Sequence, residues 1–303
     1  MTKIIFSRKG FDSIAGGIPS SKSGEHLISF PIPYKKNTLT TYNHIGLGKD
    51  IKELSNNRIK PTDTCHFDPN LDYGEFGQVG AAQTHLENNN VGVGDLFLFW
   101  GWFRETLTVN KKIVFSKEHL GHYRFFGWMQ IGEIIHLGKD PGWYLNEVPH
   151  SRSHPHTIGL WGDNNTLYLA KEKLDVFGLT NYYGFGKFKA SERTNLSIDP
   201  SVKKSKWICP KWLNPNHGGC GMTYHKDIKR WGGDTVDIVG RGQEFIAEPK
   251  RQTDCKKWLS NIFKDAYIID EVEYFKKLKE DLNEEVIRRT LLHKDQWTRN
   301  TIH

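Results

Sequence analysis

The hydrophobic pattern predicts buried strands in the first half of the chain. Residues 3–6 are rich in β-formers and open the chain as a strand. A Gly-Asp turn at residues 94–95 precedes residues 96–102, an aromatic stretch that is short and bounded by turn residues, as buried strands are. Residues 125–135 follow the same pattern after a charged connection at residues 111–124. We expect these last two strands to be antiparallel neighbours.

Apolar spacings of three and four predict helices. Over residues 76–88, Val79, Ala82 and Leu86 form one apolar face, and the polar side chains lie elsewhere. Gln83 lies on this helix and would reach a site only if the helix opens onto it. The other expected helices are residues 50–57, 253–264 and 270–292.

The remaining segments read as turns and loops. Residues 157–161 and 166–170 flank a Gly-Asp-Asn-Asn turn, which predicts a hairpin. Strands and helices mix without strict alternation, which favours the α+β class. We expect a mixed, mostly antiparallel sheet or partial barrel with flanking helices. One domain would span residues 1–303, with a helical C-terminal part at about 253–293.

Composition adds little to this picture. The 303 residues carry 42 Lys and Arg against 35 Asp and Glu, and the net charge of +7 permits a polyanionic partner without requiring one. The 13% aromatic content argues against disorder. Four cysteines without a C-x-x-C pair argue against a disulfide scaffold or a Cys-rich zinc site. The absence of a membrane-length apolar run and of a leader predicts a cytoplasmic protein without a membrane partner.

Several enzyme classes lack their sequence signatures. The chain has no G-x-x-x-x-G-K-[ST] loop and no G-x-G-x-x-G after a strand, so a P-loop or classical dinucleotide site is unsupported. The H-E-x-x-H and G-x-S-x-G motifs are missing, as is the zinc deaminase signature. Other enzyme chemistry remains open.

The end of the first strand carries a basic cluster. Ser7, Arg8 and Lys9 precede a flexible glycine, an arrangement that can clamp a phosphate. Asp12 follows and could orient a hydroxyl or a base. A solvated turn explains the same residues equally well.

A second cluster combines an imidazole with carboxylates. His66 and Asp68 are two residues apart, and Asp72 follows four residues later. A histidine–carboxylate pair can act as general acid and base, or bind a divalent metal. An ordinary turn capped by Asp68 is the alternative.

A third cluster is rich in histidine. His150, His154 and His156 lie within seven residues beside Arg152. Three imidazoles can chelate zinc, iron or another transition metal, or they can contact phosphates.

Amide and indole groups are candidates for contacts with a base. Gln243 could recognise a base edge, and Glu244 beside it could serve as acid or base. Trp207, Trp212 and Trp231 lie in expected loops near basic residues and could stack on a base or a sugar.

Several short motifs follow one another along the chain: SRKGFDS (7–13), GGIPS (16–20), PIP (31–33), HFDPNL (66–71), GAAQTHL (80–86), GDLFLFWGWFR (94–104) and GQEF (242–245). In this order they resemble the third nucleotide-modification-associated domain family of bacterial and phage proteins, which are linked to predicted DNA-base hypermodification systems. The resemblance covers most of the chain, and implies a role near modified nucleotides without implying a particular reaction.

A shorter likeness concerns residues 93–135. A Gly-Asp turn, an aromatic strand and a second strand containing G-x-x-x-x-G-E resemble the barrel core of pseudouridine-synthase-and-archaeosine-type domains. Such a barrel can hold a flipped base in an aromatic pocket.

The leading hypothesis is an enzyme that modifies a nucleotide, a base or a nucleic acid. A nucleotide or DNA is the expected partner, together with other modification-system proteins, and a divalent metal is compatible with the residues. A binding module that recognises a modified base, and a metal-dependent hydrolase or nuclease, are the alternatives. We assign catalysis or metal binding to His66 and Asp68, catalysis to Asp12 and Glu244, metal binding to His150, His154 and His156, and substrate binding to Ser7, Arg8, Lys9, Gln83, Asp95, Trp100, Arg104 and Gln243.

Overall fold

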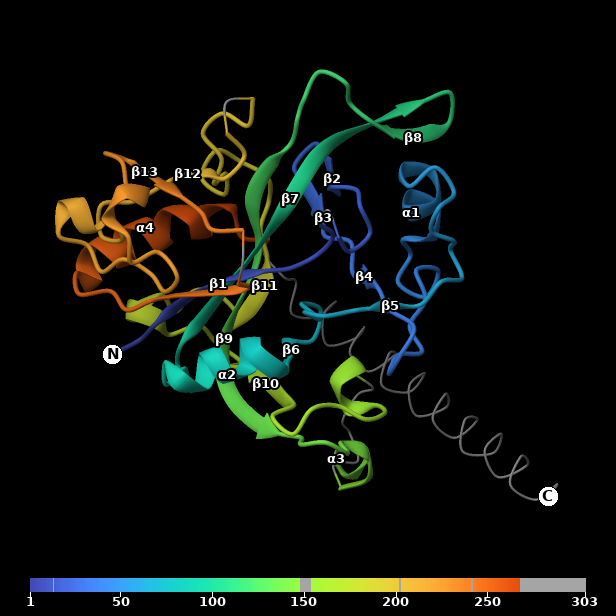
Figure 1. The fold of residues 1–303 in the computed structure, drawn as a ribbon, viewed down its shortest axis with the longest axis horizontal. Coiled ribbons are helices and arrows are strands. Elements are labelled where there is room, and N and C mark those ends of the chain that lie inside the picture. Colours follow the sequence, from blue (N-terminus) through green and yellow to red (C-terminus); the bar gives the residue numbers. More distant parts are fainter. Residues whose placement is uncertain (13, 148–153, 202, 241, 268–303) are drawn as a thin grey trace.

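The computed structural model describes residues 1–12, 14–147, 154–201, 203–240 and 242–267. The fold is α+β, as expected, and within these residues it is built on a curled mixed sheet of ten strands (Figure 1). The main path of the sheet runs β14-β1-β7-β9-β10-β6. The predicted helix at residues 270–292 and the candidate ligand His150 lie outside the described residues.

Fourteen strands and four α-helices make up the described part of the chain, together with five short 3₁₀ segments. The strands are β1 Ile4–Arg8, β2 Ser20–Ser23, β3 His26–Ile28, β4 Ile32–Pro33, β5 Cys65–His66, β6 Glu75–Gln78, β7 Leu96–Val109, β8 Lys112–Phe115, β9 His122–His136, β10 Thr166–Ala170, β11 Phe185–Lys187, β12 Lys206–Ile208, β13 Thr235–Asp237 and β14 Glu244–Ala247. The helices are α1 Gly48–Leu54, α2 Gly80–Asn88, α3 Gly142–Glu147 and α4 Gln252–Ile262, and the 3₁₀ segments are η1 Pro155–Thr157, η2 Val176–Gly178, η3 Pro215–His217, η4 Ile228–Arg230 and η5 Phe263–Asp265.

Strands β7 and β9 form the centre of the sheet. They pair antiparallel along most of their length, which confirms the expected neighbours. The connection between them contains β8, which folds back onto the end of β7. On its other edge β7 pairs in parallel with β1, so that the residues just after β1 lie beside the middle of β7.

Both faces of the first half of β7, residues 96–103, are largely buried, which explains why this part of its sequence is continuously apolar. Leu98 and Trp100 pack in a core with α4 and the segments around β12 and β13. Phe97 and Phe99 point the other way, into a core with β6, α2 and β10. Figure 1 shows the C-terminal segments in orange on one side of the sheet, and α2 with β6 on the other.

Two predicted elements are wrong. The segment predicted as one helix over residues 76–88 is β6 followed by α2, because residues 75–78 pair with β10. The predicted hairpin at residues 157–170 does not form. Its second half is β10, which pairs with β6 and β9, while its first half begins at the end of η1. Local patterns miss both outcomes because the partner strands come from elsewhere in the chain.

The expectation that loop tryptophans would stack on a base is also wrong. Trp207, Trp212 and Trp231 are at most 4% exposed and pack in the core around β7. Among the described helices, none has both the length and the apolar character that a membrane span requires.

Candidate functional site

A cavity of about 270 Å³ gathers polar and aromatic side chains from distant parts of the chain. The end of β1, the β4–β5 region, β6, the segment after η1 and the residue before β14 all line it. We call it the Asp68 cavity, after the carboxylate in its wall. Polar residues that converge on one concave site are the usual mark of a binding or active site.

Asp68 lies at the centre of the polar wall, with 5% of its side chain exposed. Its Oδ1 accepts hydrogen bonds from the Gly77 backbone N–H (2.9 Å) and from His154 Nε2 (3.2 Å). Its Oδ2 lies 3.6 Å from His66 Nε2, beyond hydrogen-bond distance. Burial alone would raise the pKa of this carboxyl group, but His154 and His66 hold the pKa well below its usual range. Asp68 is therefore ionised at neutral pH.

His156 is held as a neutral imidazole with one free nitrogen. Its Nδ1 donates to Asn165 Oδ1 (2.6 Å), and the Asn165 amide donates back to the His156 carbonyl. Burial lowers the pKa of His156 to about 3, so the ring carries no proton on Nε2 near neutrality. The Nε2 lone pair is thus available to a ligand or a proton.

His154 occupies a supporting position. It caps η1, where its Nδ1 accepts from the His156 backbone N–H, so its Nε2 carries the proton that Asp68 accepts. Its side chain is 1% exposed. His154 therefore orients both Asp68 and His156.

Aromatic rings line the cavity beside these histidines. Trp161 stacks on His156 with centroids 4.3 Å apart and planes 11° apart. Tyr34 lies nearly parallel to Trp161 at 6.2 Å, and edge-on to His66 at 5.2 Å. Aromatic faces at these positions offer stacking surfaces for a planar ligand.

A buried ion pair lies beside the cavity. Lys9 Nζ is 3.0 Å from Glu244 Oε1, which also accepts from Gln78 Nε2 at 2.8 Å. Glu244 is 1% exposed, and its Oε2 has no hydrogen-bond partner among the described residues. Lys9 also lies over the ring of Phe76, 4.2 Å from its centroid. Because these contacts occupy its ammonium group, Lys9 is less available to a phosphate than its sequence position indicates.

Strand β6 joins the two polar groups. The Gly77 N–H binds Asp68, and the Gln78 side chain binds Glu244. A Cβ atom on Gly77 would lie 2.2 Å from His156 Cδ2, so only glycine leaves room for that ring.

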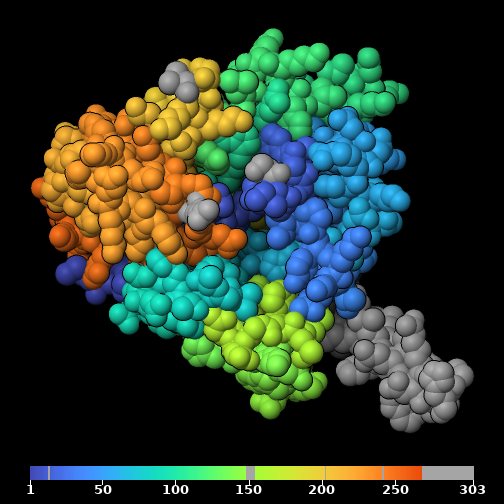
Figure 2. All heavy atoms as spheres, in the orientation of Figure 1, coloured from blue at the N-terminus to red at the C-terminus, as the bar shows by residue number. Residues whose placement is uncertain are grey.

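A second cavity, of about 480 Å³, adjoins the Asp68 cavity, because Arg8, Lys9 and Asp12 line both. It adds Trp102 and Lys204, whose Nζ lies over the Trp102 ring at 5.0 Å from its centroid. We call it the Trp102 cavity. Figure 2 shows the surface hollowed between the N-terminal segment in blue and the C-terminal segments in orange, where this cavity lies.

A family model described as nucleotide modification associated domain 3 matches residues 3–248. That range is most of the chain and contains every residue of the two cavities. The chain belongs to this family. Membership associates it with nucleotide modification. No curated protein and no solved structure matches the chain, so the likeness of residues 93–135 to a pseudouridine-synthase-and-archaeosine barrel stays a prediction.

The structure of this nucleotide modification associated domain brings many of the predicted site residues together. Arg8, Lys9, Asp12, His66, Asp68, His156 and Gln243 line the Asp68 cavity. His154 and Glu244 contact residues that line it. Asp12 also shapes the loop after β1, since its Oδ1 accepts from the Ile14 and Ala15 backbone N–H groups.

Other predicted residues lie in structural positions. Asp95 accepts from the Lys3 and Gly92 backbone N–H groups. Arg104 lines the Trp102 cavity, but its guanidinium donates to the Ser116 carbonyl. Ser7 is fully buried in β1, Trp100 is 1% exposed in the core, and Gln83 is 1% exposed with its amide bonded to Tyr168 and Glu87.

Several site residues had no clear sequence signal. Tyr34 follows a proline-rich segment that reads as a loop, Trp161 ends the first strand of the predicted hairpin, and Gln78 lies in the segment predicted as helix. Asn165 lies in the predicted turn, and only the structure shows that it orients His156. The position of Gly77 and Gln78, soon after the HFDPNL motif, is the sequence feature that indicates a role for β6 in the site.

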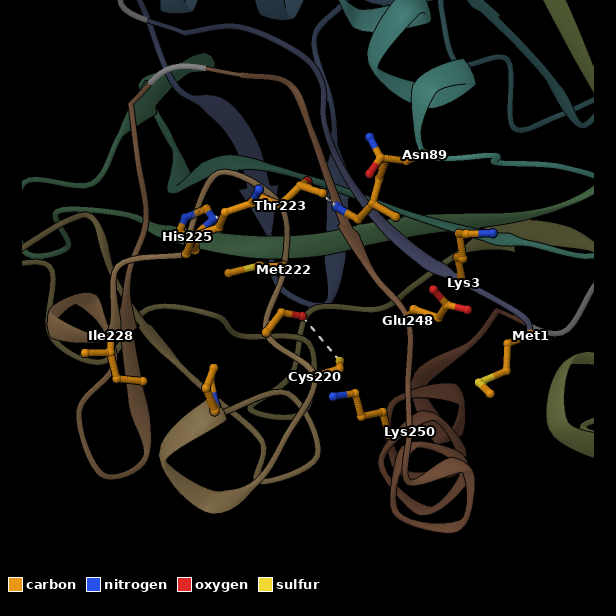
Figure 3. A pocket seen from close by; sticks show the side chains of 14 residues that line it. Met1, Lys3, Asn89, Cys220, Met222, Thr223, His225, Ile228, Glu248 and Lys250 are labelled. Carbon is orange, nitrogen blue, oxygen red and sulfur yellow. Dashed lines mark hydrogen bonds between the residues drawn. The ribbon is translucent and has the colours of Figure 1, made fainter.

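A larger cavity of about 620 Å³ lies elsewhere, and Met1 and Lys3 are among the residues that line it (Figure 3). We call it the Met1 cavity, and its groups are poorly suited to catalysis. Both ring nitrogens of His225 bond to backbone groups. Burial raises the pKa of the Cys220 thiol to about 11, and the thiol donates to a backbone carbonyl. We therefore place the chemistry in the Asp68 cavity.

Replacing Gly77 with alanine tests the packing of the site. The new methyl group meets the His156 ring, so we expect Gly77→Ala to reduce the free energy of unfolding by about 1–3 kcal/mol, measured by chemical denaturation. Gly92→Ala is the matched control, because a Cβ there meets nothing within 4 Å. Equal stability of the two variants would contradict the proposed close approach.

Proposed function

We propose that this protein binds a nucleotide, alone or within a nucleic-acid strand, and modifies its base in the Asp68 cavity. The observation that carries the proposal is the meeting of an aromatic wall and an ionised Asp68–histidine cluster in one cavity. Stacking on aromatic rings holds a base of any identity, whereas the cluster supplies groups that react.

The base would lie against Trp161 and Tyr34. Both rings line the cavity, and their near-parallel planes suit a flat heterocycle. A cavity of this volume suits a base more than a larger ligand. The Gln243 side chain, which also lines the cavity, would recognise a base edge.

His66 and Asp68 would supply reacting groups to the substrate, because both side chains line the cavity and His66 Nε2 lies 3.6 Å from Asp68 Oδ2. The neutral His156 offers a free nitrogen as an acceptor. These roles make the protein an enzyme that acts on the base.

The adjoining Trp102 cavity would receive the neighbouring phosphates of a strand. Arg8 lines both cavities and is the more available cation there, since Lys9 pairs with Glu244. Lys204 and Trp102 continue this surface with a cation and an aromatic face. A cationic groove lined by aromatic rings is typical of single-strand binding.

Trp161→Ala should weaken the binding of a nucleoside monophosphate about 5- to 150-fold, because one stacked base contributes about 1–3 kcal/mol. Isothermal titration calorimetry measures the effect, and Trp161→Phe should restore most of the affinity. Trp143→Ala is the control, since Trp143 is exposed and lines none of the three cavities. Unchanged affinity in Trp161→Ala would exclude base stacking here.

Asp68→Asn should abolish base modification while leaving most nucleotide binding intact. Nucleoside mass spectrometry of DNA from the native host, carrying the wild-type or the variant gene, measures the product. The control is Asp163→Asn. The Asp163 carboxylate follows Trp161 closely, is exposed and lines none of the three cavities. A modified base that persists in a folded Asp68→Asn protein contradicts the catalytic role. A protein that binds nucleotide but never yields a product is the binding module instead.

Lys204→Ala should weaken the binding of a single-stranded oligonucleotide without changing that of a nucleoside monophosphate. Loss of one phosphate contact lowers the slope of log affinity against log salt by about 0.7. Fluorescence anisotropy over a salt series measures it, with Lys49→Ala on α1 as the control. Equal slopes for wild type and Lys204→Ala would show that the strand does not follow the Trp102 cavity.

A further inference from the structure

His66, Asp68 and His156 bring three metal-binding groups to one point. One nitrogen of each imidazole and one carboxylate oxygen all lie within 4.8 Å of one another. In the part of the chain that the structure describes, no other set of three or more His, Cys, Asp or Glu side chains meets that spacing. His66 and Asp68 lie at and just after the end of β5, whereas His156 lies in η1, distant in the sequence.

Each donor atom is free where a metal would need it. Oδ1 of Asp68 accepts hydrogen bonds from the Gly77 N–H and from His154 Nε2. Oδ2, on the side of His66, is the oxygen that a metal would bind. The Nδ1–H of His156 donates a hydrogen bond to Asn165 Oδ1, so that Nε2 of His156 presents a lone pair. Among the described residues, Nε2 of His66 has no closer polar partner than Asp68 Oδ2 at 3.6 Å. An ion that bound all three would replace this long contact.

The supporting contacts of Asp68 and His156 match those of metal sites. A metal-binding histidine ordinarily donates its other ring N–H to a carbonyl or carboxylate oxygen, which fixes the ring, and Asn165 does this for His156. The carboxylate ligand is in turn fixed by hydrogen bonds, here from β6 and from His154 at the start of η1. Asn165 is fully buried, and this pairing leaves His156 one orientation.

We infer that His66, Asp68 and His156 bind one divalent transition-metal ion. Two imidazoles and one carboxylate suit Fe²⁺, Zn²⁺, Co²⁺ or Mn²⁺, and three protein ligands leave open positions for water or substrate. Those positions face the Asp68 cavity, which the same three side chains line. Bond lengths of about 2.0–2.2 Å require the side chains to rotate slightly inward.

The ion would change the charge of the cavity. A divalent cation with one carboxylate ligand leaves a net charge of about +1 on the site, which attracts an anionic or electron-rich group of a substrate. His154 is a positioning residue in this arrangement, because its nitrogens already bond to Asp68 and the η1 backbone. The inference concerns the protein without nucleotide, so its test does not depend on the proposed function.

The test is a Co²⁺ titration of the full-length protein after treatment with a chelator, followed by visible absorption. Bound Zn²⁺ and Fe²⁺ in the purified protein are counted by elemental analysis. We expect one equivalent of Co²⁺ to bind, and His66→Ala and His156→Gln to lose this binding. Asn165→Ala should weaken it about 10- to 100-fold, since it removes only the orienting contact. His26→Ala, at a residue that lines none of the three cavities, should bind as the wild type does.

Copper EPR of the wild type keeps the inference testable should a variant not fold. Nitrogen superhyperfine coupling from two imidazoles is expected on the bound Cu²⁺. Absence of stoichiometric metal binding by the wild type would overturn the inference. So would a Cu²⁺ spectrum without nitrogen coupling, or Co²⁺ binding that is unchanged in folded His66→Ala and His156→Gln proteins.

Discussion

The buried carboxylate of Asp68 is the constraint on which the site depends. An ionised carboxylate away from water is costly unless hydrogen bonds and positive charge compensate it. The chain supplies these from three directions: the Gly77 N–H on β6, His154 at the start of η1, and His66 beside it. These contacts join β6, the start of η1 and the residues around the end of β5 at one carboxylate. The position of the histidines therefore follows from the need to satisfy one charge.

The central sheet holds these segments in place. Because β7 is buried on both faces, it fixes β1 on one edge and β9 on the other. The residues after β1 then reach the cavity from one side, and β6, paired with β10, reaches it from the other. A rigid sheet with reactive groups on its connecting segments is a common arrangement in enzymes. The family, which is associated with nucleotide modification, agrees with a site of this kind.

The sequence alone predicts the centre of the fold well and the site only in part. The aromatic runs of β7 and β9 carry a local signal, and their antiparallel pairing follows from it. The turn containing His66 and Asp68 is visible because both residues lie within three positions. The meeting of His66 with His156, and of Lys9 with Glu244, is not visible, because it depends on long-range strand pairing. For the same reason the local pattern predicts helix at residues 76–78, although they pair with β10.

The most direct test of the account is a crystal structure of the protein with a bound nucleotide. We predict that the base lies in the Asp68 cavity, stacked on Trp161 and within reach of His66 and Asp68. A nucleotide bound only in the Met1 cavity, with the Asp68 cavity unoccupied, would contradict the account.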